Sequence, residues 1–167
     1  ASGAMLRVSD QSVANPGGIA LTIANGFTNS GTIELVTNAG NCCGPSSATL
    51  NVTTGTLTNA TGATIRSTGL SATTNTLNAQ VTNQGTIEVN QPLAVTNASR
   101  TFTSSAGTLN VASAQTLTIN DGTTTLGAGT AFSGSGKVKL AGTSHTLNLA
   151  SDLTLATSTG VALDLNG

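Results

Sequence analysis

The sequence predicts an all-β protein folded as a parallel β-helix, or β-solenoid, of about six coils. Three observations support this expectation: a composition poor in charge and aromatic rings, short strands with a period of two, and internal repeats. Of the 167 residues only 7% are charged and 2% are aromatic, whereas about 25% are charged in an ordinary soluble domain. Abundant Thr favours strands, while Gly and Asn favour tight bends. An ordinary enzyme is therefore a poor first interpretation.

Short segments along the chain alternate between aliphatic and mostly polar residues. Each directs two aliphatic side chains inward and one residue outward, which is the pattern of a half-buried strand. These segments are Leu21-Thr22-Ile23, Ile33-Glu34-Leu35, Leu93-Ala94-Val95, Leu117-Thr118-Ile119, Leu147-Asn148-Leu149, Leu153-Thr154-Leu155 and Leu163-Asp164-Leu165. Asn25-Gly26, Asp121-Gly122 and Ser135-Gly136 predict sharp corners at which glycine adopts a positive φ. A succession of strands and corners is the plan of a coil.

One unit of the chain occurs twice with nine identical or similar positions. Residues 27–35, Phe-Thr-Asn-Ser-Gly-Thr-Ile-Glu-Leu, return at residues 81–89 as Val-Thr-Asn-Gln-Gly-Thr-Ile-Glu-Val. Glycines that mark this unit and weaker copies are spaced by about 20 to 30 residues, which is typical of solenoid turns. A β-sandwich would not need whole units to resemble one another, and a membrane barrel would need aromatic girdles. A slim aliphatic core suits coils stacked about 4.8 Å apart.

The repeats resemble those of bacterial autotransporter passengers and filamentous-haemagglutinin-type adhesins. The similar units are residues 55–65 and residues 83–89, Asn-Gln-Gly-Thr-Ile-Glu-Val, and the resemblance extends from about Ile19 onward. It implies a right-handed parallel β-helix that is exported to the cell surface. Residues 1–5 are similar to a cloning-tag remnant. Residues 6–167 are expected to form a single β-solenoid domain that is a fragment of a longer surface protein.

The charge and hydropathy of the chain limit its partners. A net charge of −1, with five basic residues spread along the sequence, leaves no basic patch for nucleic acid. No apolar run approaches the roughly 20 residues of a membrane-spanning helix, so direct membrane insertion is not expected. No cofactor is expected either. The expected partners are glycans or a host surface, and neighbouring coils of the parent protein or other copies of this chain.

Cys42 and Cys43 are adjacent in a segment that interrupts the repeat between two strands. Adjacent cysteines can form a strained vicinal disulfide, pair with another chain, or remain as two free thiols. A metal site would need further soft ligands, and the single histidine, His145, is about a hundred residues away. No metal site is predicted. The segment is either a recognition loop on a rigid solenoid or an insertion tolerated at a corner.

Two glutamates and two lysines are candidates for surface contact. Glu34 and Glu88 occupy the same place in the matched repeat and are expected to point outward on one face. If two coils separate them, their backbones lie about 10 Å apart, near the carboxylate separation of inverting glycosidases. An outward Glu between aliphatic residues is more often a solubility residue that discourages lateral aggregation. Lys137 and Lys139 flank Val138 on an outward face. No catalytic residue is predicted.

Thr-x-Thr steps at residues 56–58, 101–103 and 116–118 resemble those of flat ice-binding solenoids. Ice binding needs such pairs on the same face of consecutive coils. When the repeats are aligned, charged residues interrupt the array of Thr pairs. The aligned outward pairs are Thr32 and Glu34, Thr56 and Thr58, Thr86 and Glu88, Thr108 and Asn110, and Lys137 and Lys139. No ice-binding face is therefore predicted. Asn residues at corners are expected to stack in ladders, each amide bonding to the coils above and below.

The predicted function is non-catalytic. The chain is expected to be a structural and adhesive segment of a secreted or cell-surface bacterial protein, located outside the cell, that presents loops and a polar face for cell-surface or glycan adhesion. Two alternatives stay open. One is a fragment of a carbohydrate-active β-helix enzyme, with Glu34 and Glu88 as its acids. The other is a segment of a phage tail spike, which predicts a trimer.

Overall fold

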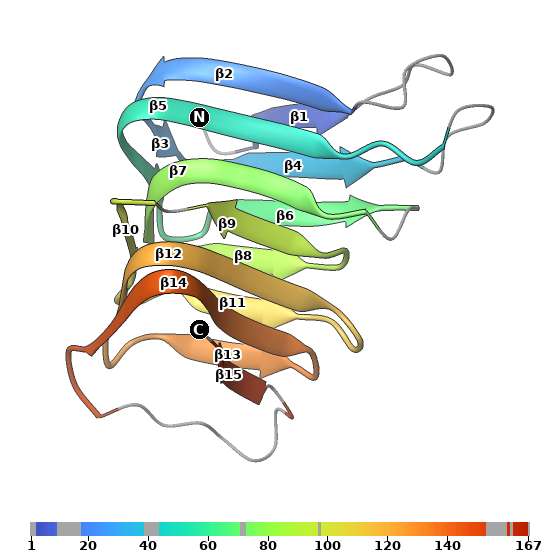
Figure 1. The fold of residues 1–167 in the computed structure, drawn as a ribbon. Helices are drawn as coiled ribbons and strands as arrows, with labels where there is room; N and C mark the ends of the chain where they lie inside the picture. The colour runs from blue at the N-terminus through green and yellow to red at the C-terminus, as the bar shows by residue number, and fades with distance from the viewer. Residues whose placement is uncertain are drawn as a thin grey trace.

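The computed structural model of the chain is a right-handed coil of parallel strands, with no helix among the residues it describes (Figure 1). The structure describes residues 3–9, 18–38, 44–70, 73–96, 98–152, 160 and 162–166. Its strands are β1 (Met5–Ser9), β2 (Ile19–Asn25), β3 (Thr28–Asn29), β4 (Thr32–Thr37), β5 (Ala48–Asn59), β6 (Thr64–Gly69), β7 (Asn75–Asn83), β8 (Thr86–Val89), β9 (Leu93–Thr96), β10 (Thr101–Ser104), β11 (Thr108–Val111), β12 (Thr116–Leu126), β13 (Ala131–Gly134), β14 (Lys137–Leu149) and β15 (Ala162–Asn166).

Six strands stack in one sheet, in the order β1-β4-β6-β8-β11-β13, and each marks one coil. The first residues of these strands are in register, and they are Met5, Thr32, Thr64, Thr86, Thr108 and Ala131. Successive coils therefore advance by 27, 32, 22, 22 and 23 residues. Every pairing between these strands is parallel. The predicted β-solenoid of about six coils is confirmed.

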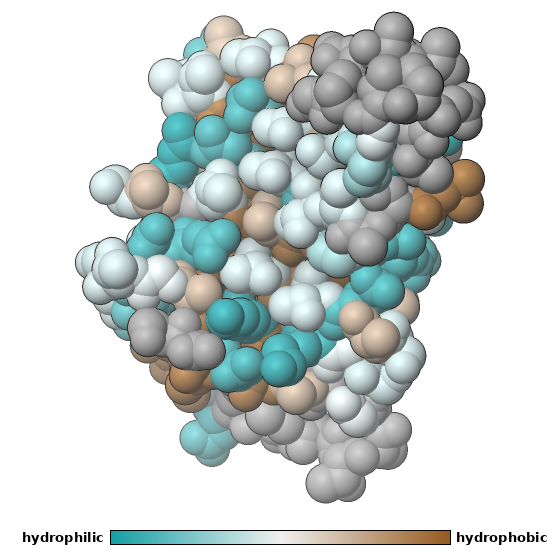
Figure 2. Space-filling model, turned by 45° about the vertical axis from the view of Figure 1, so that its right-hand side comes forward, coloured by the Kyte–Doolittle hydropathy of each residue, from teal (hydrophilic) through white to brown (hydrophobic). Residues whose placement is uncertain are grey.

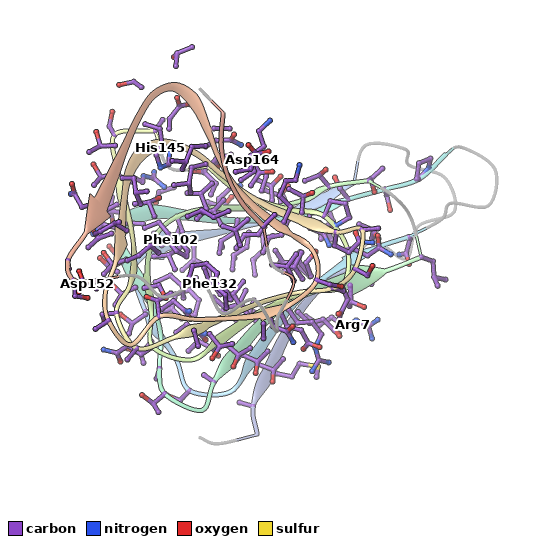
Figure 3. All side chains as sticks on the ribbon, turned by 90° about the horizontal axis from the view of Figure 1, so that it is seen from below. Arg7, Phe102, Phe132, His145, Asp152 and Asp164 are labelled. Atoms are coloured by element: carbon purple, nitrogen blue, oxygen red, sulfur yellow. The ribbon has the colours of Figure 1, made fainter. Side chains whose placement is uncertain are left out.

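Each coil has three faces, because the chain turns a corner within its second half. β5 and β7 stay paired on both sides of a shift in register between Asn51 and Thr56. β12 and β14 do the same around a shift between Asn120 and Gly122. In the fourth coil this corner separates two strands, β9 and β10. Seen along the axis in Figure 3, these bends give the coil a roughly triangular outline.

We name the three faces by their strands and outward side chains. The charged face is the outer surface of the six-stranded sheet and carries Glu34 and Glu88. The front face, toward the viewer in Figure 1, is formed by the strand segments before the corner and carries Asn78. The threonine face is formed by the segments after the corner and carries Thr82 and Thr103. It lies at the left of Figure 1, where β3 and β10 are drawn.

Glycine serves two purposes at the predicted corners. Gly122 adopts a positive φ of 69°, as expected. Gly26 and Gly136 do not, so the predicted conformation is wrong at these two positions. Their function is close packing, since a Cβ on Gly26 would lie 2.3 Å from the backbone nitrogen of Thr56, and a Cβ on Gly136 would lie 2.3 Å from the carbonyl oxygen of Ala112.

Inward side chains fill the coil with aliphatic groups stacked on similar groups. Leu50, Leu77, Val95 and Ile119 are in register on successive coils, and all four are fully buried. Burying such a side chain stabilises the fold by about 1.5 to 3 kcal/mol. Phe102 also points into this interior, as Figure 3 shows. The low aromatic content thus reflects an interior too narrow for many rings.

A buried ladder of polar side chains runs beside this core. The Nδ2 of Asn29 donates to Oδ1 of Asn59 at 2.8 Å, and the Nδ2 of Asn59 donates to Oδ1 of Asn83 at 2.9 Å. The Nδ2 of Asn83 lies 3.5 Å from Oγ of Ser104 in the next coil. Buried amides require such partners, because an unpaired one costs about 1 to 3 kcal/mol. The predicted asparagine ladder is confirmed.

The terminal strands of the described stack have a neighbour on one side only. At one end β1 pairs with β4 and β2 with β5, and Met5 and Ile19 are 59% and 41% exposed. At the other end Leu149 and Leu165 are 51% and 64% exposed. Unpaired edges with apolar side chains are surfaces on which further strands can stack. The strand predicted at residues 153–155 lies outside the described residues.

Candidate functional site

Glu34 of β4 and Glu88 of β8 both point outward on the charged face, two coils apart, as predicted. The strand between them, β6, places Arg66 in register with each. On the other side of Glu34, β1 places Arg7 in register with it. Positive and negative side chains therefore alternate along four consecutive coils.

Arg66 holds both carboxylates of this charge ladder. Its Nε lies 2.7 Å from Oε2 of Glu88, and its Nη1 lies 3.7 Å from Oε1 of Glu34. Arg7 Nε lies 3.3 Å from Oε2 of Glu34, and Asn90 Nδ2 donates to Oε1 of Glu88 at 2.9 Å. In an inverting glycosidase two carboxyl groups flank a scissile bond and a water. Here a guanidinium occupies the space between them.

The ladder shifts the protonation of its members. Burial alone would raise the pKa of Glu88, but hydrogen bonds from Asn90 and Arg66, with the charge of Arg66, outweigh it and lower that pKa below its ordinary value of 4.5. The hydrogen bond with Glu88 and the negative charge of Glu88 raise the pKa of Arg66. Both side chains are therefore charged at neutral pH, and the charged face is internally neutralised.

The Glu88 carboxylate should make stability depend on acid pH. Its folded pKa is lowered, so its contribution is present above about pH 4.5 and is lost as the pH falls through the folded pKa. We expect the urea midpoint of the wild-type protein to fall between pH 7 and pH 3 by more than that of Glu88→Gln. In free energy of unfolding, the difference between the two proteins is less than about 1 kcal/mol, since the Arg66–Glu88 pair is partly exposed.

Salt provides the control for this pH dependence. At 1 M salt the screening length is about 3 Å, so the difference between the wild-type protein and Glu88→Gln at pH 7 should shrink. A wild-type midpoint that falls no more than that of Glu88→Gln on acidification would show that the ladder makes no linked contribution.

Lys137 and Lys139 lie on the front face, at the start of β14, and not in line with Glu34 and Glu88. They are in register with β12 on one side and with β15 on the other, and Lys137 Nζ lies 3.2 Å from Oδ2 of Asp164. The alignment that placed them with the glutamates is wrong. Every face of a coil repeats the same alternation of aliphatic and outward residues, so units from different faces look alike in sequence.

The threonine face carries two columns of uncharged side chains. The first is in register over five consecutive coils and consists of Thr28, Thr58, Thr82, Thr103 and Thr125. The second lies two residues earlier on each strand and consists of Thr56, Gln80, Thr101, Thr123 and Thr146. Nine of these ten positions are threonine, so the face presents nearly one chemical group throughout.

This arrangement corrects the expectation that charge interrupts the Thr-x-Thr array. The steps at residues 56–58 and 101–103 belong to the threonine face, and residues 123–125 supply another copy. The step at residues 116–118 lies on the front face. Glu34 and Glu88 lie on the charged face, and Lys137 and Lys139 lie on the front face. Grouping Thr-x-Thr by position after each corner, instead of by its distance from glycine, would have found the columns.

A hollow of about 350 Å³ opens at the corner between the front face and the threonine face. It joins three consecutive coils, and its lining residues are Ala98, Ser99, Asp121, Gly122, Thr123, Thr143, Ser144 and Thr146. Ser99 and Asp121 have positive φ values of 59° and 57°. Non-glycine residues in this conformation are uncommon and cluster at functional sites. The sequence predicts only a corner at Asp121-Gly122, and no pattern in it indicates this hollow.

His145 stands in the chain between Ser144 and Thr146, which line the hollow, and its side chain turns inward (Figure 3). Its Nε2 lies 3.0 Å from Oγ1 of Thr124, which is fully buried in the preceding coil. Its Nδ1 is buried and has no hydrogen-bond partner among the described residues. This histidine is a corner residue that anchors one coil to the next.

Cys42 and Cys43 lie outside the described residues. Their segment is bounded by an antiparallel bridge, in which the backbone nitrogen of Asn38 donates to the carbonyl oxygen of Ser46 at 3.1 Å, and that of Ser46 donates back at 3.0 Å. β4 ends before this bridge and β5 begins after it. The segment thus lies between two strands in the chain, as predicted.

The described ranges contain neither a metal-binding cluster nor a membrane-spanning helix. No three His, Cys, Asp or Glu residues within them form a group that could hold a metal ion. No helix in those ranges is long and apolar enough to cross a membrane. Comparison with protein-family models, with curated proteins and with solved structures finds no match to this chain.

Proposed function

We propose that the chain is a non-catalytic structural and adhesive segment of a secreted or cell-surface bacterial protein. The observation that carries this proposal is a closed aliphatic core under polar columns that repeat from coil to coil. In Figure 2 hydrophilic and neutral side chains cover most of the described surface, and apolar ones appear as separate patches. The resemblance of the repeats to autotransporter passengers and filamentous-haemagglutinin-type adhesins supports a location at the bacterial surface.

The front face is held rigid by hydrogen bonds between coils. Asn51 Nδ2 donates to Oγ1 of Thr22 at 3.3 Å, and Asn78 Nδ2 donates to Oδ1 of Asn51 at 3.2 Å. Arg100 Nη1 then reaches Oδ1 of Asn78 at 3.2 Å. A surface whose polar groups are already ordered loses little conformational entropy when it binds. Such a surface suits weak, repeated hydrogen bonding to glycans.

The corner hollow is a candidate for a glycan contact, because it brings polar groups of three coils together. Its volume of about 350 Å³ lies at the lower end of the range for ligand sites. Asp121 supplies a carboxylate that accepts hydrogen bonds from sugar hydroxyls, and Ser99, Thr143 and Ser144 supply hydroxyls that both donate and accept. Hydrogen bonds to a charged acceptor are about twice as strong as neutral ones. The hollow would therefore take one sugar unit of a neutral glycan.

Two further interpretations make different demands on the molecule. An enzyme fragment with Glu34 and Glu88 as its acids needs both carboxylates to face one substrate, but Arg66 pairs with both. This arrangement favours the non-catalytic proposal. A tail-spike segment requires a trimer, so light scattering would give three times the mass of the 16.3 kDa chain.

A glycan array tests the adhesive proposal. We expect the wild-type protein to bind a subset of neutral glycans, and Asp121→Asn to bind the same glycans about tenfold more weakly. Asparagine tolerates the positive φ at this position, so the fold is retained.

Glu88→Gln is the matched control, since it also removes one carboxylate but on the charged face. It should bind like the wild-type protein. Absence of binding to every glycan, or an equal loss in Asp121→Asn and Glu88→Gln, would contradict the proposed contact.

A further inference from the structure

The two threonine columns form a regular two-dimensional array. Neighbouring coils are about 4.8 Å apart, and alternate residues along a strand are about 6.6 Å apart. Five coils in register make the first column about 19 Å long. The spacing between coils lies close to the shorter repeat of oxygen atoms on the prism face of hexagonal ice, and the spacing along a strand is about a tenth below the longer repeat. We propose that the threonine face binds ice crystals, through water ordered over its methyl and hydroxyl groups.

Three hydroxyl groups at the centre of the first column can form hydrogen bonds with partners outside the protein. Among the described residues, the hydroxyls of Thr58, Thr82 and Thr103 have no hydrogen-bond partner in the chain. Part of the second column is bonded within the face, because Nε2 of Gln80 donates to Oγ1 of Thr56 at 2.7 Å. On the other two faces the central polar groups bond to each other: Arg66 to Glu88 on the charged face, and Asn78 to Asn51 on the front face. The first column of the threonine face therefore presents hydroxyls that can bond to partners outside the protein.

The charge pattern selects a neutral partner. None of the ten positions in the two columns is ionised, and neither is Asn148, which follows Thr125 in register. A charged side chain would orient the surrounding water by its field, whereas hydroxyl and methyl groups allow water to keep the geometry of a lattice. A nucleic acid, a mineral or an anionic lipid surface would require charge at these positions.

The array is ordered before any partner arrives. Threonine is stiff at χ1 because it is branched at Cβ. Each member of the first column from Thr28 to Thr103 is followed directly by a rung of the buried ladder, which ends at Ser104. These internal bonds fix the spacing of the coils directly beneath the outward groups. A surface that is already rigid and periodic loses little conformational entropy when it binds a rigid periodic solid.

Ice fits this face better than a crystalline polysaccharide does. Sugar rings in crystalline chains are usually recognised through aromatic platforms, and no aromatic side chain occupies any position of the two columns. The only groups presented are methyls, hydroxyls and one amide at Gln80. These groups match a lattice in which every molecule both donates and accepts hydrogen bonds.

Partition into growing ice and inhibition of ice recrystallisation test the proposal with the purified wild-type chain. We expect the protein to concentrate in the ice fraction and to keep ice grains small. Thr82→Lys with Thr103→Lys, at the centre of the first column, should raise the concentration required for inhibition by about tenfold or more. A wild-type protein that is excluded from ice like a salt would overturn the proposal, whatever the glycan array shows.

The matched control places two lysines on neighbouring coils of the front face. Thr49 and Thr76 are outward, half-buried and in register on β5 and β7, so Thr49→Lys with Thr76→Lys adds the same charge elsewhere. This variant should inhibit recrystallisation like the wild-type protein. Equal losses in the two variants would overturn the assignment of the face.

A second variant covers the case in which the central lysines prevent folding. Thr82→Ser with Thr103→Ser keeps both hydroxyls and the neutral surface but removes two methyl groups. It should fold like the wild-type protein and lose part of the inhibition, by about threefold or more. Full inhibition in this folded variant would contradict a role for the threonine methyls. Binding to cellulose or chitin powder without binding to ice would assign the face to a polysaccharide and overturn the proposal.

Discussion

Asn59→Ala is expected to lower the free energy of unfolding by about 3 kcal/mol or more, because it breaks the buried ladder in its middle. Asn59 is fully buried, accepts a hydrogen bond from Asn29 and donates to Asn83 and to the carbonyl oxygen of Thr86. Alanine removes all three hydrogen bonds. Asn29 Nδ2 keeps only its bond to the carbonyl oxygen of Thr64 at 3.1 Å, and Oδ1 of Asn83 loses its donor in a place that water does not reach. Urea unfolding at pH 7 measures the change as a shift of the midpoint at constant slope.

Asn51→Ala is the control for this prediction. Asn51 bonds to Asn78 and Thr22 in the same coil-to-coil manner, but on the outer side of the front face. Water replaces its bonds when it is removed, so its cost should stay below about 1 kcal/mol. Similar costs for Asn59→Ala and Asn51→Ala would mean that the inner ladder contributes no more than a surface contact.

Phe102→Ala should be the most destabilising single change in the core, at about 3 to 5 kcal/mol. Its ring is fully buried, and β10 is covered by β7 on one side and by β12 on the other. Both flanking coils are fixed by their own register, so the cavity left by the ring cannot readily collapse. The urea midpoint and the heat of thermal unfolding both report this loss.

Phe132→Ala provides the comparison, since it removes the same ring at a less enclosed place. Phe132 is 8% exposed, and β13 has a neighbour, β11, on one side only. In a solenoid a residue is stabilised by the coils next to it, so its loss should cost less than about 3 kcal/mol. If Phe132→Ala proves as costly as Phe102→Ala, stability is not built from neighbouring coils in this way.

The coil itself could be predicted from the sequence, because two local signals agree with the global fold. Alternation with a period of two requires strands, and the return of residues 27–35 at residues 81–89 requires stacked units. The ladder through Asn59 follows from the same repeat, in which Thr-Asn stands at the end of the threonine face. A fold can be predicted from sequence when the local pattern and the global fold agree in this way.

The faces could not be assigned correctly from the same signals. Coils of 22 to 32 residues differ by insertions, so distance along the chain does not identify a face. The corners within β5 and β12 interrupt neither strand, and therefore leave no clear boundary in sequence. Residues 64–66, Thr-Ile-Arg, match residues 32–34, Thr-Ile-Glu, and this match indicates the position of Arg66 between the glutamates.

The corner hollow depended on packing that no local pattern encodes. Ser99, Asp121 and Thr143 come from three coils, and they meet because the coils turn at nearly the same place. Their spacing of about 22 residues in sequence is the coil length, but each residue type is common in this chain. The register between the coils is what places the Asp121 carboxylate beside the hydroxyls of Ser99 and Thr143.

The register of the threonine face is tested most directly by methyl–methyl nuclear Overhauser effects in a sample with isotope-labelled threonine methyl groups. The stacking described above requires an unbroken series of contacts from Thr28 through Thr58, Thr82 and Thr103 to Thr125. Contacts between Thr32 and Thr56, with none between Thr58 and Thr82, would instead place the Thr-x-Thr steps beside the charged residues and contradict the array.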